Sequence, residues 1–252
     1  MKALHRVPAG FGAGAAASEW SLSYTPFAMS RLCVILFGPP GSGKGTQAKF
    51  LKQALGIAHI STGDMLREHM AAGDGLGHEI AATIQAGGLV PDETVNLMVE
   101  ERIELPDSKT GFILDGFPRT VNQAKLLVGL LAAHGIRPVV VHLKVDYNVI
   151  IARLSGRRQC PTCGALYSVT SNAPTVSEVC DYDGSKLVVR EDDREEVVRE
   201  RLRAYEKQTT PVLDFLRGSG YTVLDVEGAD ASPAAIARRI EALIRKEVGP
   251  AQ

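Results

Sequence analysis

The sequence predicts an α/β fold in which helices cover both faces of a parallel sheet. Short apolar runs alternate along the chain with longer amphipathic stretches, which is the pattern of parallel strands joined by crossover helices. A Gly-rich loop lies between the first apolar run and the first helical stretch, where α/β proteins commonly bind anions. Residues 61–90 and 157–191 break the alternation, so we expect them to be two insertions on one core.

The apolar runs predict where the strands lie. Five parallel strands are expected, at residues 32–37, 58–60, 112–114, 139–145 and 221–226. Amphipathic periodicity predicts helices at residues 46–55, 121–134, 148–154, 194–216 and 233–246. We therefore expect a core of residues 31–60, 91–156 and 192–248, a helical insertion at 61–90, and a Cys- and Pro-rich insertion at 157–191.

Composition excludes several classes of protein. The formal net charge of −1, from 28 basic and 29 acidic residues, gives no general attraction to nucleic acid or to an anionic membrane. No stretch supplies the roughly 18 apolar residues that a membrane span needs. The cysteines are too few and too uneven for a secreted disulfide framework, so a cytoplasmic location is expected. No heptad pattern or long apolar edge argues against a monomer. Residues 1–30, rich in Ala and Gly, are expected to be a disordered or accessory extension, with a targeting peptide as an alternative.

A phosphate-binding loop is the most specific motif. Residues 38–46 read GPPGSGKGT between an apolar strand and a helix, so their backbone N–H groups are expected to converge on one anion. Lys44 adds a charge that can follow a transferring phosphoryl group. A plain Gly-rich turn is the alternative. The expected ATP contacts in the loop are Gly41, Ser42, Gly43, Lys44, Gly45 and Thr46, although Gly45 separates Lys44 from Thr46 and weakens direct metal ligation by the hydroxyl.

A second motif, GFILDGFPRT at residues 111–120, is an apolar strand that ends in a carboxylate. Parallel sheets place ligands at the carboxyl ends of their strands. There Asp115 can hold Mg²⁺, through water, and Arg119 presents a planar fork for a phosphate, on a turn shaped by Gly116 and Pro118. A helix-capping loop with a surface arginine is the alternative.

Together with the segment STGDMLR at residues 61–67, these motifs make the chain resemble adenylate kinases, a family of nucleoside monophosphate kinases. The resemblance covers residue 31 to about residue 246. It implies a three-layer P-loop fold with a five-stranded parallel sheet, and transfer of a phosphoryl group from MgATP to AMP to give two ADP. It also implies that Thr62 faces the base and Arg67 the AMP phosphate. The further AMP contacts that it implies are Gly88, Leu89, Val90, Gly116, Phe117, Pro118, Arg119, Gln123, Arg190 and Arg201.

Arginines flank the second insertion on both sides. Transfer of a γ-phosphoryl group depends on positioning and charge neutralisation, so several arginines around one phosphate chain are expected. By resemblance, Arg153 and Arg157 contact ATP, and the catalytic set is Lys44, Arg119, Arg153, Arg157, Arg190 and Arg201. Asp192 and Asp193 match an acidic pair of the family. Arg158 and Arg199 are expected to be ordinary solvated residues.

Three of the four cysteines lie in the second insertion at the spacing of a zinc knuckle. Cys160, Cys163, Cys180 and Asp183 can form a closed tetrahedral site for a structural Zn²⁺, and the arrangement resembles the lid of zinc-containing bacterial adenylate kinases. A Cys160–Cys163 disulfide is the alternative, and Asp181 is a rival to Asp183. Cys33, in the first strand, is expected to pack in the core.

Two other functions are alternatives to AMP phosphorylation. A kinase for UMP, CMP or another monophosphate would use the same loop and read a different base, but Thr62, Gln123 and the long second insertion favour AMP. A nucleic-acid-binding protein with a zinc finger is disfavoured because residues 157–193 carry more acidic than basic side chains. The expected partners are therefore ATP, AMP and ADP.

Overall fold

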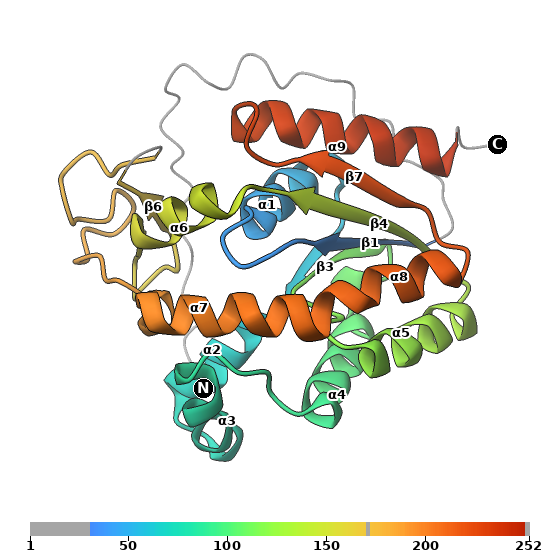
Figure 1. The fold of residues 1–252 in the computed structure, drawn as a ribbon, viewed down its shortest axis with the longest axis horizontal. Helices are drawn as coiled ribbons and strands as arrows, with labels where there is room; N and C mark the ends of the chain where they lie inside the picture. The colour runs from blue at the N-terminus through green and yellow to red at the C-terminus, as the bar shows by residue number, and fades with distance from the viewer. Residues whose placement is uncertain (1–30, 170–171, 250–252) are drawn as a thin grey trace, which may run out of the picture. The chain divides into compact units, whose positions relative to one another are not determined.

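A five-stranded parallel sheet lies at the centre of the computed structural model, which describes residues 31–169 and 172–249 (Figure 1). The expected N-terminal extension lies outside the described residues. In spatial order the strands are β2 (Ala58–Ser61), β3 (Gly111–Asp115), β1 (Leu32–Phe37), β4 (Arg137–Lys144) and β7 (Val223–Glu227). Every neighbouring pair is parallel, and the sequence order reverses direction on either side of β1. The predicted strands are thus confirmed, with shifts of one or two residues at their ends.

Helices cover both faces of this sheet, as Figure 1 shows. Contacts link α1 (Lys44–Leu55) with α9 (Pro233–Val248) on one face, and α5 (Val121–Ala133) with α8 (Thr210–Gly218) on the other. The pattern of α9 explains its placement, because Ile236, Ile240 and Ile244 repeat at helical spacing and are all buried. Further elements of the described chain are α4 (Asp92–Ile103), η2 (Pro106–Ser108) and α6 (Tyr147–Ser155).

The first predicted insertion contains the helices α2 (Thr62–Ala72) and α3 (Gly75–Gln85), which pack on each other. Each begins at a capping side chain: Ser61 accepts a hydrogen bond from the N–H of Asp64 (3.2 Å), and Asp74 accepts one from the N–H of Gly77 (2.7 Å). Gly77 makes their close packing possible, since a Cβ there would lie 2.2 Å from the carbonyl oxygen of His69.

The second predicted insertion contains a small antiparallel pair, β5 (Arg157–Gln159) and β6 (Leu166–Ser168), followed by a short turn, η3 (Glu191–Asp193). A few side chains in its described part form a local core: Cys160, Tyr167, Cys180 and Leu187. This segment connects α6 to α7 (Glu195–Ala204).

The helix predicted over residues 194–216 is interrupted, so that prediction was wrong in one respect. Between α7 and α8 lies a π-helical turn, η4 (Tyr205–Thr209), in which the N–H of Thr210 donates to the carbonyl of Tyr205. Pro211 gives the reason, because proline has no N–H to donate to the carbonyl four residues earlier and its ring crowds that carbonyl. The wider turn accommodates both effects.

Replacing either of two glycines of α3 by alanine should change the free energy of unfolding, in opposite directions. Gly77→Ala is expected to lower the free energy of unfolding of the α2–α3 pair by about 1 to 3 kcal/mol, because the new methyl group meets the backbone of α2. Gly75→Ala, on the same helix with open space around it, should raise that free energy by about 0.5 to 1 kcal/mol. Amide hydrogen exchange in α2 and α3, beside urea unfolding, measures both. Equal effects of the two changes would contradict the packing argument.

Candidate active site

The glycine loop lies at the carboxyl end of β1 and leads directly into α1. Gly41 and Gly43 have φ values of 81° and 100°, which favour glycine over residues with a Cβ. Gly43 is also the N-cap of α1, and as a glycine it offers no side chain to occupy the first N–H groups of the helix. Those N–H groups and the helix dipole therefore remain available to an anion.

Lys44, the first residue of α1, bends back across the loop. Its Nζ donates to the carbonyl oxygens of Gly38 (2.7 Å) and Pro39 (3.0 Å). Burial lowers the pKa of Lys44 to about 8; the charge of Asp115 opposes this shift, and nearby arginines, Arg119 first, add to it. At neutral pH the ammonium group is still mostly protonated, so it can neutralise phosphate charge.

Asp115 ends β3 beside the loop. A Cβ on Gly45 would lie 3.3 Å from its Oδ2, and the Nε2 atom of His59, on β2, lies 3.4 Å from the same oxygen. The three residues come from α1, β3 and β2, whose ends meet at one edge of the sheet. A carboxylate next to a phosphate loop is a group that Mg²⁺ prefers, usually with water between them.

A cavity opens between α2 and the turn after β3, and most of the residues expected to contact AMP line it. Its lining includes Thr62, Arg67, Gly88, Leu89, Val90, Gly116, Arg119, Gln123 and Arg201. An adjacent cavity is lined by Lys44, Phe117 and Pro118, together with Arg119 and Arg201. The two cavities thus share cationic walls.

Hydrogen bonds fix the turn between β3 and α5. The Oγ1 of Thr62 donates to the carbonyl of Gly116 (3.0 Å), and the Nε of Arg119 donates to the same oxygen (2.8 Å). The Phe117–Pro118 peptide bond is cis. Burial lowers the pKa of Arg119 to about 10, and the positive charge of Arg201 acts in the same direction.

Carboxylates hold the arginines on either side of the second insertion. Arg157 and Arg201 both donate to Asp193, whose side chain is fully buried. Arg201 also lies 3.0 Å from Asp192. The acidic pair thus links the start of β5 to α7.

The remaining arginines of the expected set have other partners. Arg153 bridges the loop and the segment after β7 by donating to the carbonyls of Ser42 (3.1 Å) and Gly228 (2.8 Å). Arg190 donates to Gln159 (2.5 Å), and burial lowers the pKa of Arg190 to about 10. Arg67 pairs with Asp64 (2.5 Å).

The Cys group lies in two equivalent turns of the second insertion. In each, a Gly with a φ near 70° donates to the carbonyl of a Cys four residues earlier: Gly164 to Cys160, and Gly184 to Cys180. Cys163 and Asp183 occupy the same position in the two turns. The four ligand atoms of Cys160, Cys163, Cys180 and Asp183 lie within 4.8 Å of one another.

These distances fit a tetrahedral metal site. The Sγ atoms of Cys163 and Cys180 are 3.6 Å apart, and Cys160 Sγ lies 3.2 Å from Asp183 Oδ2. Zinc–sulfur bonds of about 2.3 Å give sulfur pairs separated by roughly 3.8 Å. A hydrogen bond from the N–H of Ser185 lowers the pKa of Asp183 below its usual range, which keeps the carboxylate ionised. All of the cysteines are free thiols, so the alternative of a disulfide is not observed.

Sequence comparisons agree with this geometry. A family model described as "Adenylate kinase" matches residues 36–221. The chain is 49% identical over 199 residues to an adenylate kinase of Anaeromyxobacter dehalogenans strain 2CP-1, a match that covers 78% of this chain and 92% of the relative. Adenylate kinases of Thermosipho melanesiensis (44% identity; 82% of this chain and 99% of the relative) and Moorella thermoacetica (46%; 81% and 94%) are similar. The chain belongs to the adenylate kinase family.

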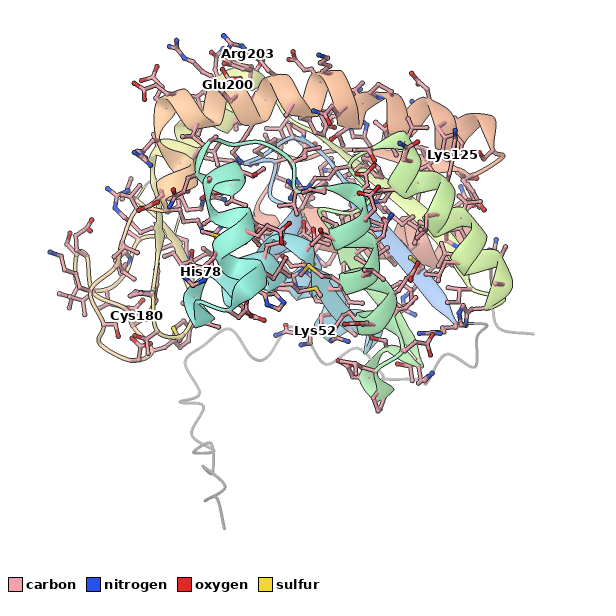
Figure 2. All side chains as sticks on the ribbon, turned by 90° about the horizontal axis from the view of Figure 1, so that it is seen from below. Lys52, His78, Lys125, Cys180, Glu200 and Arg203 are labelled. Atoms are coloured by element: carbon pink, nitrogen blue, oxygen red, sulfur yellow. The ribbon has the colours of Figure 1, made fainter. Side chains whose placement is uncertain are left out.

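The match to the adenylate kinase family model spans the glycine loop, the segments 61–67 and 111–120, and the Cys group. The expected site residues differ in exposure and in whether they line the two cavities. Thr46 is exposed and lines neither cavity, and Arg153, Arg157 and Arg190 are also outside the lining sets. Arg199, expected to be solvated, is exposed and pairs with Glu195 on α7. Figure 2 shows Glu200 and Arg203 pointing outward from the same helix. Arg158 differs from that expectation, since it is half-buried and pairs with Glu178 (3.1 Å).

Several residues near the adenylate kinase site were not identified from the sequence. The buried Thr209, on the π-helical turn, donates to the carbonyl of Arg119 (2.9 Å), and Tyr205 lines the cavity beside Lys44. Pro211 was the available signal for this turn, because a proline inside a helical pattern disturbs the hydrogen-bond ladder. Asp92 bonds to Gln123, a contact between residues 31 positions apart that no local pattern indicates.

None of the helices in the described residues combines the length and the apolar character needed to cross a bilayer.

The buried carboxylate of Asp193 should matter more for stability than an exposed one. Asp193→Ala leaves Arg157 and Arg201 half-buried with one partner fewer, and we expect it to lower the free energy of unfolding by about 3 kcal/mol. Asp214→Ala is the matched control, because Asp214 is 81% exposed and should change that free energy by less than about 0.5 kcal/mol. Urea unfolding without nucleotide measures both, and equal losses would refute the argument.

Proposed function

We propose that the chain catalyses the reversible transfer of the γ-phosphoryl group of MgATP to AMP, giving two ADP and so maintaining the balance of adenine nucleotides. The observation that carries this proposal is the pair of adjacent cavities with shared cationic walls. One adjoins the phosphate loop and the other contains the expected monophosphate contacts, with Arg119 and Arg201 lining both. Two phosphate-bearing ligands bound there would meet at these guanidinium groups.

The ATP side of the proposed site consists of the loop and two arginines. The N–H groups of Gly41, Ser42, Gly43, Lys44, Gly45 and Thr46 would hold the phosphates, with Lys44 on the transferring group. Arg153 and Arg157 would contact ATP as well. Asp115 would hold the Mg²⁺ of MgATP through water, a role that its position against Gly45 supports.

The AMP side would bind the base and the phosphate by different groups. Thr62, Gly88, Leu89, Val90 and Gln123 would surround adenine, while Gly116, Phe117 and Pro118 shape the turn beside it. Arg67, Arg119, Arg190 and Arg201 would bind phosphate oxygens through charge-assisted hydrogen bonds. These guanidinium groups now bond to Asp64, Gly116, Gln159 and the Asp192–Asp193 pair, so some bonds must exchange when phosphates enter.

In this mechanism the protein's own part is positioning and charge neutralisation. The arginines reduce the repulsion between the two phosphate chains and stabilise the charge on the transferring group. We propose that residues 61–90 form a monophosphate-binding flap and residues 157–191 a lid on the core of residues 31–60, 91–156 and 192–248. Closure of both would exclude water and so prevent the transfer of the phosphoryl group to water.

We further propose that Cys160, Cys163, Cys180 and Asp183 hold a structural Zn²⁺ in the lid. With four protein ligands no coordination position remains for substrate, so the ion would cross-link the two turns and take no part in phosphoryl transfer. The free thiols of these cysteines also agree with the reducing cytoplasm as the proposed location, and the protein is proposed to act there as a monomer.

A panel of nucleoside monophosphates tests the proposed reaction. Purified protein with MgATP and AMP, UMP, CMP or GMP in turn should form a nucleoside diphosphate fastest from AMP, and Lys44→Ala should lower kcat by about a hundredfold or more. Coupled detection of ADP, with chromatography of the second product, measures this. Preference for another monophosphate would overturn the base assignment to Thr62 and Gln123. A lack of transfer to any of them, with salt-sensitive binding of DNA or RNA, would favour the nucleic-acid-binding alternative.

Metal content tests the proposed zinc site. The purified protein should contain one equivalent of zinc, and its removal by a chelator should lower Tm by several degrees. Asp183→Ala should weaken zinc binding by about a hundredfold, as measured by competition with a chromogenic chelator. Asp181→Ala is the control and should leave the zinc content unchanged. The reverse result would make Asp181 the fourth ligand, and an unchanged zinc affinity in both variants would refute an Asp ligand.

A further inference from the structure

The side chain of Asp92, at the start of α4, connects two residues at the start of α5. Its Oδ1 accepts a hydrogen bond from Nε2 of Gln123 (2.8 Å), and its Oδ2 accepts one from the hydroxyl of Thr120 (2.9 Å). That hydroxyl in turn caps α5 by accepting from the N–H of Gln123 (3.1 Å). Asp92 follows closely after Val90, so the chain that lines the AMP-side cavity leads directly into this contact.

These contacts allow only one orientation of the Gln123 side-chain amide. Its Oε1 accepts from the backbone N–H of Arg119 (2.7 Å), while its Nε2 donates to Asp92. A backbone N–H can only donate and an ionised carboxylate can only accept. A rotation of the amide by 180° would therefore place a donor against a donor and an acceptor against an acceptor.

The fixed amide still has bonding capacity on the cavity side. Gln123 lines the cavity, and each end of its amide has used one of its two hydrogen bonds on these partners. The second lone pair of Oε1 can accept from an amine, and the second hydrogen of Nε2 can donate to a ring nitrogen. Adenine presents this pair of groups, whereas a 6-oxopurine presents an acceptor where adenine has its amine.

We propose that Asp92 is a positioning residue for base selection: by fixing the Gln123 amide, it makes the site favour a 6-aminopurine monophosphate over a 6-oxopurine monophosphate. The inference rests on the proposed function, because it assumes that the monophosphate binds in the cavity that Gln123 lines. It adds a residue that does not line the cavity itself.

A helix-stabilising role is the competing explanation. Asp92 and Glu93 are both acidic residues in the first turn of α4, where negative charge stabilises the helix dipole. Glu93 is exposed and lies in the same first turn of the helix. The hydrogen bonds of Gln123 described above go to Arg119, Thr120 and Asp92, not to Glu93. Glu93→Ala is therefore the matched control for Asp92→Ala.

The test compares AMP with IMP, which differs from AMP in carrying an oxo group in place of the 6-amino group, at saturating MgATP. Asp92→Ala should raise the KM for AMP by about tenfold and lower the preference for AMP over IMP, measured as kcat/KM, by a similar factor. The kcat with AMP and the KM for MgATP should stay within about twofold of wild type. Glu93→Ala should change none of these, and Asp92→Asn, which keeps one acceptor for Gln123, should fall between wild type and Asp92→Ala.

A double-mutant cycle identifies the route of the effect. If Asp92 acts through Gln123, Asp92→Ala should add almost nothing to the loss already caused by Gln123→Ala. Fully additive losses, an unchanged AMP-to-IMP preference in Asp92→Ala, or equal effects of Asp92→Ala and Glu93→Ala would overturn the proposal. Should Asp92→Ala fail to fold, the same comparisons are made with Asp92→Asn. Failure of the wild type to phosphorylate AMP is a separate result, which would overturn the proposed function first.

Discussion

Positive charge accumulates at the carboxyl edge of the sheet, and the rest of the site must compensate for the repulsion between these cations. Lys44, Arg119 and Arg190 are all buried enough for their pKa values to fall well below those of free side chains. Neighbouring guanidinium groups lower these values further, so the cations repel one another. Asp115 and the Asp192–Asp193 pair offset part of this repulsion in the absence of nucleotide. A polyphosphate would relieve the remainder, which is why such a site has a high intrinsic preference for dense negative charge.

So many cationic side chains can approach one point only if they come from separate helices, strands and loops. Arg67 lies on α2, Arg119 between β3 and α5, Arg157 on β5 and Arg201 on α7. No single helix or loop could present so many cations to one point without strong local repulsion. A parallel sheet solves this problem because the loops that follow its strands all emerge at the carboxyl edge. The insertion after β2 extends from this edge, and the end of α6 lies against the loop, where Arg153 bonds to Ser42, so the arginines that follow both elements can face the loop.

The parts of this arrangement that the sequence predicts are those with local signals. The strands are predicted by apolar runs, the loop by glycines before a lysine, and each half of the proposed zinc site by two closely spaced ligand residues, because each of these patterns is complete within about ten residues. Asp92 and Thr209 could not be identified in this way, since their partners lie 31 and 90 positions away. Their role depends on which helix ends become neighbours, and that is set by packing. The π-helical turn is an intermediate case. Pro211 predicts that the helical hydrogen-bond pattern is disturbed there, but it does not predict whether the helix kinks or widens into a π turn.

The proposed lid, residues 157–191, raises a separate question of stability, because its own core is small. In its described part only Cys160, Tyr167, Cys180 and Leu187 form a buried cluster, and two of these are proposed metal ligands. So few apolar contacts cannot offset the conformational entropy of about 35 residues, and small segments of this kind need a cross-link. The two turns that hold Cys160 and Cys180 are tied to the base of the lid, where Gln159 pairs with Val188 and binds Arg190. An ion that joins the turns would therefore also fix the two segments that carry Arg157 and Arg190, so the proposed lid would move as one body and bring both arginines to the phosphates together.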